Sequence, residues 1–195
     1  MKGKHILFGI SGSFCNHANI LKELEKLCAN NDVQAVVSEN VYTCSTRFFK
    51  NTDFLKTLEE LTGKPIMHTI VEAETIGPSN MYDLMIIAPM SASLCSRLKN
   101  GLYDHPVALA AKAMVRNQKN IVVGIASNDV LGASASNFFS LIDRKYFFVL
   151  PFYQDAPFDK PYSIVSCWSL LEKTCDMALA NEQIQPLFYG EEYHV

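Results

Sequence analysis

Short apolar runs alternate with longer segments of mixed polarity along this chain. The runs predict buried strands at residues 4–10, 33–37, 84–88, 121–126 and 146–150, and a weaker run predicts one more at 66–71. They lack strict alternation of apolar and polar residues, which is typical of strands buried on both faces of a parallel sheet. Pro89 is expected to end the strand at 84–88.

The segments between these runs carry apolar residues at helical spacing. They predict helices at about 21–28, 53–61, 134–144 and 164–181, and two short helices between the strands at 84–88 and 121–126. Gly63 is expected to end the helix at 53–61. Asp104 is expected to cap the second short helix, with Pro106 in its first turn. Residues 77–80 and 151–161 are expected to be loops.

The alternation of strands and helices continues without an internal repeat or a linker. It predicts an α/β protein with a doubly wound parallel sheet, in a Rossmann-like or flavodoxin-like three-layer arrangement. The length of 195 residues suits a single domain over residues 1–195, with a C-terminal helix and tail. Hydrophobic residues make up 49% of the chain, which is enough for a sizeable core.

Charge and hydropathy exclude two classes of partner. The formal net charge is -3 and the basic residues are scattered, so no nucleic-acid-binding surface is expected. No apolar run reaches the roughly 18 residues of a membrane span. The first run is broken by Gly9 and Ser11 and is interpreted as a strand rather than a signal sequence. We therefore expect a cytoplasmic protein without membrane contact.

The cysteines and histidines form no pattern of metal ligands. Six cysteines are widely spaced without a C-x-x-C pair, which favours free thiols over disulfides. Cys167 and Cys175 are expected to be packing residues on the last helix. The five histidines are dispersed, so no metal site is predicted.

Two loops rich in small and hydroxyl residues follow strands that are expected to be neighbours. They are residues 11–14 and 89–93, after the strands at 4–10 and 84–88. In doubly wound sheets, ligands bind at the carboxyl ends of such strands, where the strand order reverses. Each loop leads into a helix, whose first N–H groups and positive dipole end favour an anion. The pair of loops therefore predicts a phosphate or anion site.

The first of these loops has residues suited to this role. Gly9 and Gly12 are expected to let the chain turn tightly and an anion approach closely, while Ser11 and Ser13 add hydroxyl donors. A plain strand-to-helix turn is the alternative. The dinucleotide fingerprint G-x-G-x-x-G is absent, although Glu39 stands where a ribose-binding acid is found. Residues 9–13 nearly spell a G-x-S-x-G nucleophile elbow but end in serine, so hydrolase chemistry is disfavoured.

Several segments together resemble a known family. They are residues 9–13, Ser38, residues 45–48, residues 88–93, Arg97, residues 101–104 and residues 126–128. As a set, this pattern resembles the flavoprotein family that includes the homo-oligomeric flavin-containing cysteine decarboxylases, over residues 4–150. Ser93 stands where the family motif has asparagine.

The resemblance implies FMN as cofactor, with a site for phosphate or another nucleotide as the alternative. Its phosphate would meet the N–H groups of Gly12 and Ser13, near the hydroxyls of Ser11, Ser38 and Thr46. Its ring would lie toward the second loop, which contains Pro89, Ser91, Ala92 and Ser93. The resemblance also implies a homo-oligomer built from trimers, with the flavin near an interface between protomers.

Residues 107–116, 124–129 and 151–158 carry a finer resemblance, to a branch whose members form one half of a two-component oxidoreductase. It implies oxidation of a partly reduced cyclic dicarboxylate to pyridine-2,6-dicarboxylate in spore-forming bacteria, with NADP on the partner component. Arg47 and Arg97 are candidates for binding the carboxylates, and Asn128 is a further catalytic candidate. His68 lies near the position of the decarboxylases' active-site histidine, but an ordinary surface histidine is favoured. The alternatives are a stand-alone flavin-dependent decarboxylase and a non-catalytic flavin- or nucleotide-binding module.

Overall fold

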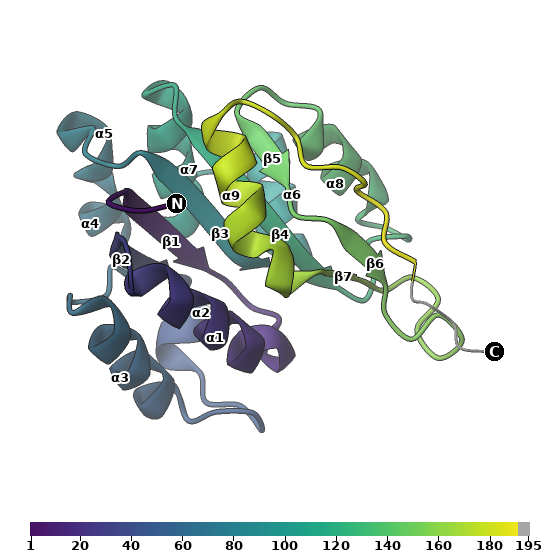
Figure 1. Ribbon diagram of the computed structural model, residues 1–195. Helices are drawn as coiled ribbons and strands as arrows, with labels where there is room; N and C mark the ends of the chain where they lie inside the picture. Colours follow the sequence, from purple (N-terminus) through teal and green to yellow (C-terminus); the bar gives the residue numbers. More distant parts are fainter. Residues whose placement is uncertain (191–195) are drawn as a thin grey trace.

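A computed structural model describes residues 1–190 and has a mostly parallel sheet between two layers of helices (Figure 1). Its strands are β1 (His5–Ile10), β2 (Asp32–Val37), β3 (Leu84–Met90), β4 (Asn120–Ser127), β5 (Phe147–Val149), β6 (Phe152–Gln154) and β7 (Ile164–Ser166). Five of them run parallel in the order β2-β1-β3-β4-β5, and β7 and β6 extend β4 antiparallel. This order confirms the predicted doubly wound fold and places β1 beside β3 at the point where the order reverses.

The helices cover both faces of the sheet. They are α1 (His17–Cys28), α2 (Glu39–Thr43), α3 (Asn51–Thr62), α4 (Ile70–Glu74), α5 (Ile76–Ser79), α6 (Ala92–Asn100), α7 (Pro106–Arg116), α8 (Ala135–Ile142) and α9 (Leu171–Leu179), with 3-10 turns η1 (Phe14–Asn16) and η2 (Trp168–Leu170). Buried residues of α1, α3 and α9 share one hydrophobic cluster, and those of α4 to α8 share the other. Within residues 1–190, no helix is long and apolar enough to cross a membrane.

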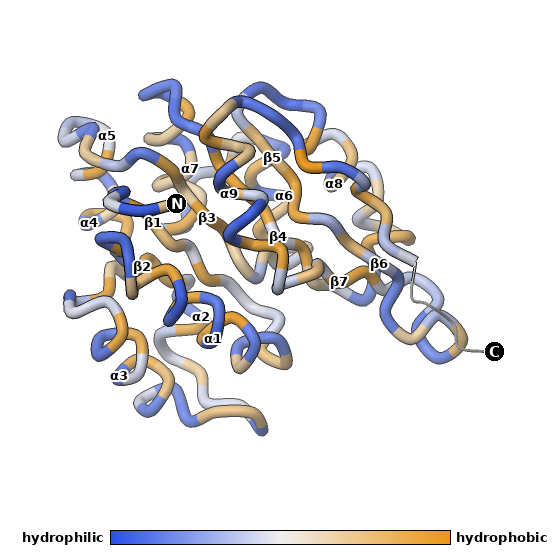
Figure 2. The backbone as a smooth tube through the Cα atoms, viewed as in Figure 1, coloured by the Kyte–Doolittle hydropathy of each residue, from blue (hydrophilic) through white to orange (hydrophobic). Residues whose placement is uncertain are grey.

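Each central strand contributes to both clusters because successive side chains point to opposite faces of a sheet. In β1, Ile6 and Phe8 pack with α1 and α3, whereas Leu7 packs on the opposite face. Figure 2 shows the resulting apolar strands under helices whose outer positions are hydrophilic. Burial on both faces explains why these strands appear in the sequence as continuous apolar runs.

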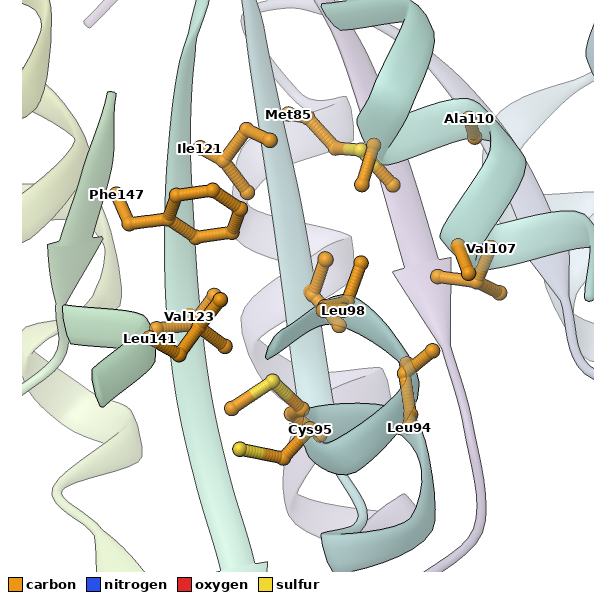
Figure 3. Packing of buried hydrophobic residues seen from close by; sticks show 14 of the residues in the cluster. Met85, Leu94, Cys95, Leu98, Val107, Ala110, Ile121, Val123, Leu141 and Phe147 are labelled. Carbon is orange, nitrogen blue, oxygen red and sulfur yellow. The ribbon is translucent and has the colours of Figure 1, made fainter. Parts of the chain in front are cut away.

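The helices α6 and α7 pack closely on the sheet next to the carboxyl end of β1. Figure 3 shows Leu94 and Leu98 of α6 and Val107 of α7 directed toward side chains of β3 and β4. Gly9 lies under this contact, because a Cβ atom at Gly9 would stand 2.7 Å from Val107 Cγ1. Gly9 therefore permits helix packing, and its φ angle is not in the left-handed region.

The predicted strand at 66–71 is wrong. Met67 makes only an isolated bridge to Val36, and α4 begins three residues later at Ile70. Thr69 and Glu72 form a capping box, in which each side chain accepts a backbone N–H bond of the other residue. The predicted loop at 77–80 likewise overlaps the short helix α5.

Two predicted boundaries also differ from the structure, and two others are confirmed. Strand β3 continues through Pro89 to Met90, with a shift in its pairing with β4 after Ile87. The missing N–H of proline is accommodated at this irregularity. Gly63 ends α3 in the left-handed conformation and Pro106 begins α7, as predicted. The cap of α7 is His105 rather than Asp104, whose carboxylate pairs with an arginine instead.

The segment from 151 to 181 differs most from the prediction. Residues 152–154 and 164–166 form the hairpin strands β6 and β7, and α9 begins only at Leu171. Tertiary pairing overrides the helical pattern here, because Val165 pairs with both Ala126 of β4 and Tyr153 of β6. Cys167 consequently precedes the helix that holds Cys175, and all six cysteines are free.

Candidate functional site

A cavity of about 910 Å³ lies at the carboxyl ends of β1, β3 and β4. Figure 1 shows the strand arrowheads pointing toward η1 and toward the β6–β7 hairpin, which bound this region. We call residues 11–16 together with 89–93 the inner wall, and residues 153–168 the hairpin wall. Both contribute lining residues, and the loop that carries Arg47 and Phe48 adds a third side. The volume is in the range of small-molecule and cofactor sites.

Hydrogen bonds join the two loops of the inner wall. Ser91 N–H donates to Ser11 Oγ at 2.9 Å, and Ser11 Oγ donates to the Pro89 carbonyl at 3.0 Å. Ser11 N–H donates to the same carbonyl at 3.2 Å. Ser11 is only 1% exposed and does not line the cavity. Its hydroxyl therefore holds the predicted loops together.

Of the next two residues of the loop, Ser13 lines the cavity and Gly12 does not. Ser13 adopts a left-handed φ of 70° and donates its hydroxyl to the Ala126 carbonyl at the end of β4. A Cβ atom at Gly12 would lie 3.8 Å from Ser91 Cβ, which is ordinary contact. Since the Ser11 and Ser13 hydroxyls are used within the protein, backbone N–H groups remain as the anion donors of this loop.

The side chain of His17 holds this loop by a hydrogen bond, and no sequence motif singles His17 out. Its side chain is buried, and Nε2 donates to the Ser11 carbonyl at 3.1 Å. The ring stacks on Phe54 with centroids 4.6 Å apart. Burial lowers the pKa of His17, so the imidazole is neutral near pH 7. The only indication of this role in the sequence is its position six residues after Ser11, at the start of a helix.

The start of α6 completes the inner wall. Ser91 is the N-cap, and its Oγ accepts the Leu94 N–H bond at 3.3 Å. Ala92 and Ser93 occupy the first turn and line the cavity. First-turn N–H groups have no acceptor within the helix, and the helix dipole adds positive potential there. This end of α6 therefore suits an anionic group.

Two predicted hydroxyl residues shape the loop that carries Arg47. Ser38 is buried and caps α2 by accepting the Val41 N–H bond at 3.3 Å. Thr46 Oγ1 accepts the Phe48 N–H bond at 3.2 Å. Neither side chain lines the cavity, whereas Arg47 does, with its guanidinium 4.8 Å from the Phe48 ring centroid.

The remaining sequence candidates separate into two groups. Asn128 lines the cavity just after β4, next to Asp129, whose carboxylate accepts bonds from the Ser127 and Ser134 hydroxyls. Arg97 does not line it, and its guanidinium pairs with Asp104 on the outside of α6.

His68 also lies outside the cavity lining. Its ring stacks on Tyr42 with centroids 3.6 Å apart. Its Nδ1 lies 3.6 Å from a carboxylate oxygen of Glu72. These contacts belong to the packing of α2 and α4.

The hairpin wall contains further residues of the site that the sequence pattern does not single out. Trp168 Nε1 donates to Asn16 Oδ1 at 3.2 Å, which connects the two walls. Its ring fills the space beside Gly124, where a Cβ atom would lie 2.6 Å from Cζ3. Lys160 Nζ lies 3.1 Å from Asp155 Oδ2 on the same wall. The concentration of aromatic and charged residues between the prolines at 151–161 was the available signal.

The cavity therefore combines two kinds of recognition. Backbone N–H groups and Arg47 favour an anion, while Phe14, Phe48 and Trp168 provide aromatic surface. Such a lining suits an anionic ligand with a planar ring.

Comparison with known proteins identifies the family of this chain. The model of the Flavoprotein family matches residues 1–159, so the chain belongs to that family. It is 40% identical to the B subunit of dipicolinate synthase from Bacillus subtilis (strain 168) over 188 residues, which cover 96% of this chain and 94% of that protein.

Solved structures give the same relationship. The crystal structure of the dipicolinate synthase B subunit from Bacillus halodurans superposes with a TM-score of 0.89 at 36% identity, covering 97% of this chain and 98% of that one. A dodecameric FMN-dependent Ubix-like decarboxylase from Escherichia coli O157:H7 has a TM-score of 0.58 at 18% identity, covering 70% of this chain and 74% of that one. The second likeness shows a shared fold.

Proposed function

We propose that this protein is the B subunit of a dipicolinate synthase and takes part in oxidising a partly reduced precursor to pyridine-2,6-dicarboxylate during sporulation. The similarity to dipicolinate synthase B subunits over nearly the whole chain supports the reaction. The cavity at the switch point of the sheet is the observation that carries the site.

The donor set of the inner wall fits the phosphate of FMN. The proposed cradle consists of the backbone at Ser13 and the first turn of α6 at Ala92 and Ser93, which line the cavity, together with the adjoining backbone of Gly12. Ser11 and Ser91 hold these two segments in register, and His17 fixes the first from below. Preorganised backbone donors of this kind bind an anion without first breaking their own hydrogen bonds.

The rest of the cavity accommodates the flavin ring and the substrate. When bound, FMN supplies a two-electron acceptor. Ser91, Ala92 and Ser93 line the cavity beside the proposed ring position, whereas Pro89 lies outside the lining, and Arg47 offers a guanidinium to a substrate carboxylate. In the described part of the chain, no carboxylate lies within ion-pair distance of Arg47, so its charge is available to a ligand. Asn128 lies on the same cavity and would orient the substrate by hydrogen bonding.

We propose that the protein works in the cytoplasm with a dipicolinate synthase A subunit that holds NADP. The absence of the G-x-G-x-x-G fingerprint agrees with a nicotinamide site on the partner. The dodecameric assembly of the Ubix-like decarboxylase supports a homo-oligomer, and we propose that this oligomer is built from trimers. We further propose that residues 1–195 form a single functional domain.

Flavin binding tests the cofactor directly. The purified full-length protein is expected to show visible flavin absorbance and to release FMN on denaturation. Gly12→Asp is expected to abolish FMN binding, because it places a side chain and a negative charge in the cradle. Gly12→Ala is the matched control, since a Cβ there meets only ordinary contact. A colourless protein that FMN does not stabilise thermally would disprove the cofactor, and unchanged FMN affinity in Gly12→Asp would disprove its placement.

Reconstitution tests the reaction. The A subunit should co-purify with this protein, and only the pair should form pyridine-2,6-dicarboxylate at full rate with NADP. Full activity of the isolated protein would instead favour a stand-alone enzyme. Flavin binding without activity in either preparation would favour a non-catalytic module.

A further inference from the structure

The cavity contains a second cation that faces the ligand space from the hairpin wall. Of the two arginines expected to bind carboxylates, only Arg47 lines the cavity, because Arg97 is held by Asp104 on the outside of α6. Lys160 lines the cavity from the connection between β6 and β7. Figure 1 shows this connection and the loop between α2 and α3 extending from separate sides of the carboxyl edge of the sheet. The two cations therefore approach one cavity on different loops.

We infer that Lys160 and Arg47 each bind one carboxylate of a small planar dicarboxylate, and that Asp155 occupies the ammonium group of Lys160 until that ligand displaces it. This inference rests on the proposed function and names the residues that select its substrate class. A ligand with two carboxylates on a rigid ring needs two cations, since a single cation would leave one desolvated carboxylate unpaired.

The ion pair on the hairpin wall has the properties of an exchangeable contact. Lys160 Nζ lies 3.1 Å from Asp155 Oδ2, and the two side chains are 54% and 40% exposed. Exposed ion pairs of this kind contribute little to stability, so a carboxylate ligand competes with Asp155 at small cost. The Ser163 hydroxyl lies 3.3 Å from the Ser127 carbonyl and 3.5 Å from the same Asp155 oxygen, so it can turn to the carboxylate when Lys160 turns away.

The other carboxylate of the cavity does not compete for Lys160. Both oxygens of Asp129 accept hydroxyl bonds, from Ser127 at 2.7 Å and from Ser134 at 2.9 Å. Asp129 is therefore held at the end of β4, and Asp155 is the anion that holds Lys160.

Calorimetric titration of the full-length protein with pyridine-2,6-dicarboxylate, in the presence of FMN, tests this assignment. Lys160→Gln is expected to weaken binding about tenfold, as for a lost charge-assisted hydrogen bond. Asp155→Asn is expected to strengthen it, because the competing anion is removed. Lys160→Arg should restore most of the affinity. Lys56→Gln is the matched control, since Lys56 forms an exposed ion pair with Glu60 on α3.

A ligand with one carboxylate separates the clamp from a general charge effect. Pyridine-2-carboxylate should lose less affinity than the dicarboxylate in Lys160→Gln. Equal dicarboxylate affinity of Lys160→Gln and the wild type would overturn the inference, as would a wild-type protein that does not bind the dicarboxylate. Flavin absorbance and co-purification with the A subunit test the proposed function separately. If they fail while binding still depends on Lys160, the proposed function is wrong and the clamp stands.

Discussion

The inner wall and the hairpin wall border the same cavity but are built differently. In the inner wall, Ser11 is 1% exposed and bonded to two residues of the neighbouring loop, Pro89 and Ser91. In the hairpin wall, the Lys160 side chain is 54% exposed and pairs with a neighbour on its own loop. The first wall depends on the packing of the parallel sheet, whereas the second adds side chains at its margin.

Because of this difference, we expect the two walls to bind different groups. A buried network rigidifies the donors that meet a constant group, here the proposed cofactor phosphate. Exposed charges on a hairpin can exchange partners, which suits a ligand that enters and leaves. Removing the buried hydroxyl of Ser11 should therefore reduce stability, and removing the exposed charge of Lys160 should mainly alter ligand binding.

The largest expected effect is from Gly9→Ala, beneath the inner wall. The new methyl group would stand 2.7 Å from Val107 Cγ1 and 3.1 Å from Met85 Cε. Overpacking of this kind costs about 1–3 kcal/mol of unfolding free energy. Urea denaturation measures the loss, and Gly12→Ala should change stability by less than about 0.5 kcal/mol. Equal stability of both variants would contradict the close packing of α7 on β1.

A smaller effect on stability is expected when one polar group is removed from either wall. Ser11→Ala removes a buried acceptor and a donor and should cost about 1–2 kcal/mol of stability. Lys160→Gln removes an exposed ion pair and should cost less than about 0.5 kcal/mol. Thermal and urea unfolding of both variants give the comparison. If Lys160→Gln destabilises the protein as much as Ser11→Ala, the hairpin wall is structural and the expected difference between the walls is wrong.

A fall in pH is expected to destabilise the protein on the side of the molecule near the inner wall. Burial, with a contribution from Arg97, lowers the pKa of His105 at the start of α7 to about 4. The unfolded chain binds this proton near pH 6.5, so stability is lost as the pH falls from about 6.5 toward 4. His105→Phe should lose less stability than the wild type over this interval, as measured by urea denaturation at several pH values. His17 contributes in the same direction, because burial lowers its pKa as well.

The control for this pH dependence is the interval above pH 7. Both histidines are neutral there in the folded and unfolded states, so the wild type and His105→Phe should show parallel stability curves. A pH dependence that is identical in the two proteins below pH 6.5 would show that His105 is not responsible.

The two walls also differ in how far local sequence patterns predict them. The local pattern predicts that residues 11–13 and 89–93 meet at the reversal of strand order, and β1 and β3 are indeed neighbours there. At the hairpin wall, the same kind of pattern predicts a loop and a helix. The strands found there are three residues each and obtain their conformation from pairing with β4 and with each other. No local pattern marks strands that short.

The sequence by itself determined the alternation of strands and helices, the doubly wound sheet and the position of the loops at its switch point. These properties follow from local patterns, because burial on both faces makes a strand continuously apolar and Gly63 or Pro106 marks a helix boundary. Only the tertiary structure decided which hydroxyls hold the loops together and which cation faces the cavity. The Ser11 hydroxyl forms hydrogen bonds with Pro89 and Ser91, and the Arg97 guanidinium pairs with Asp104. Local sequence patterns do not encode the geometry of these contacts.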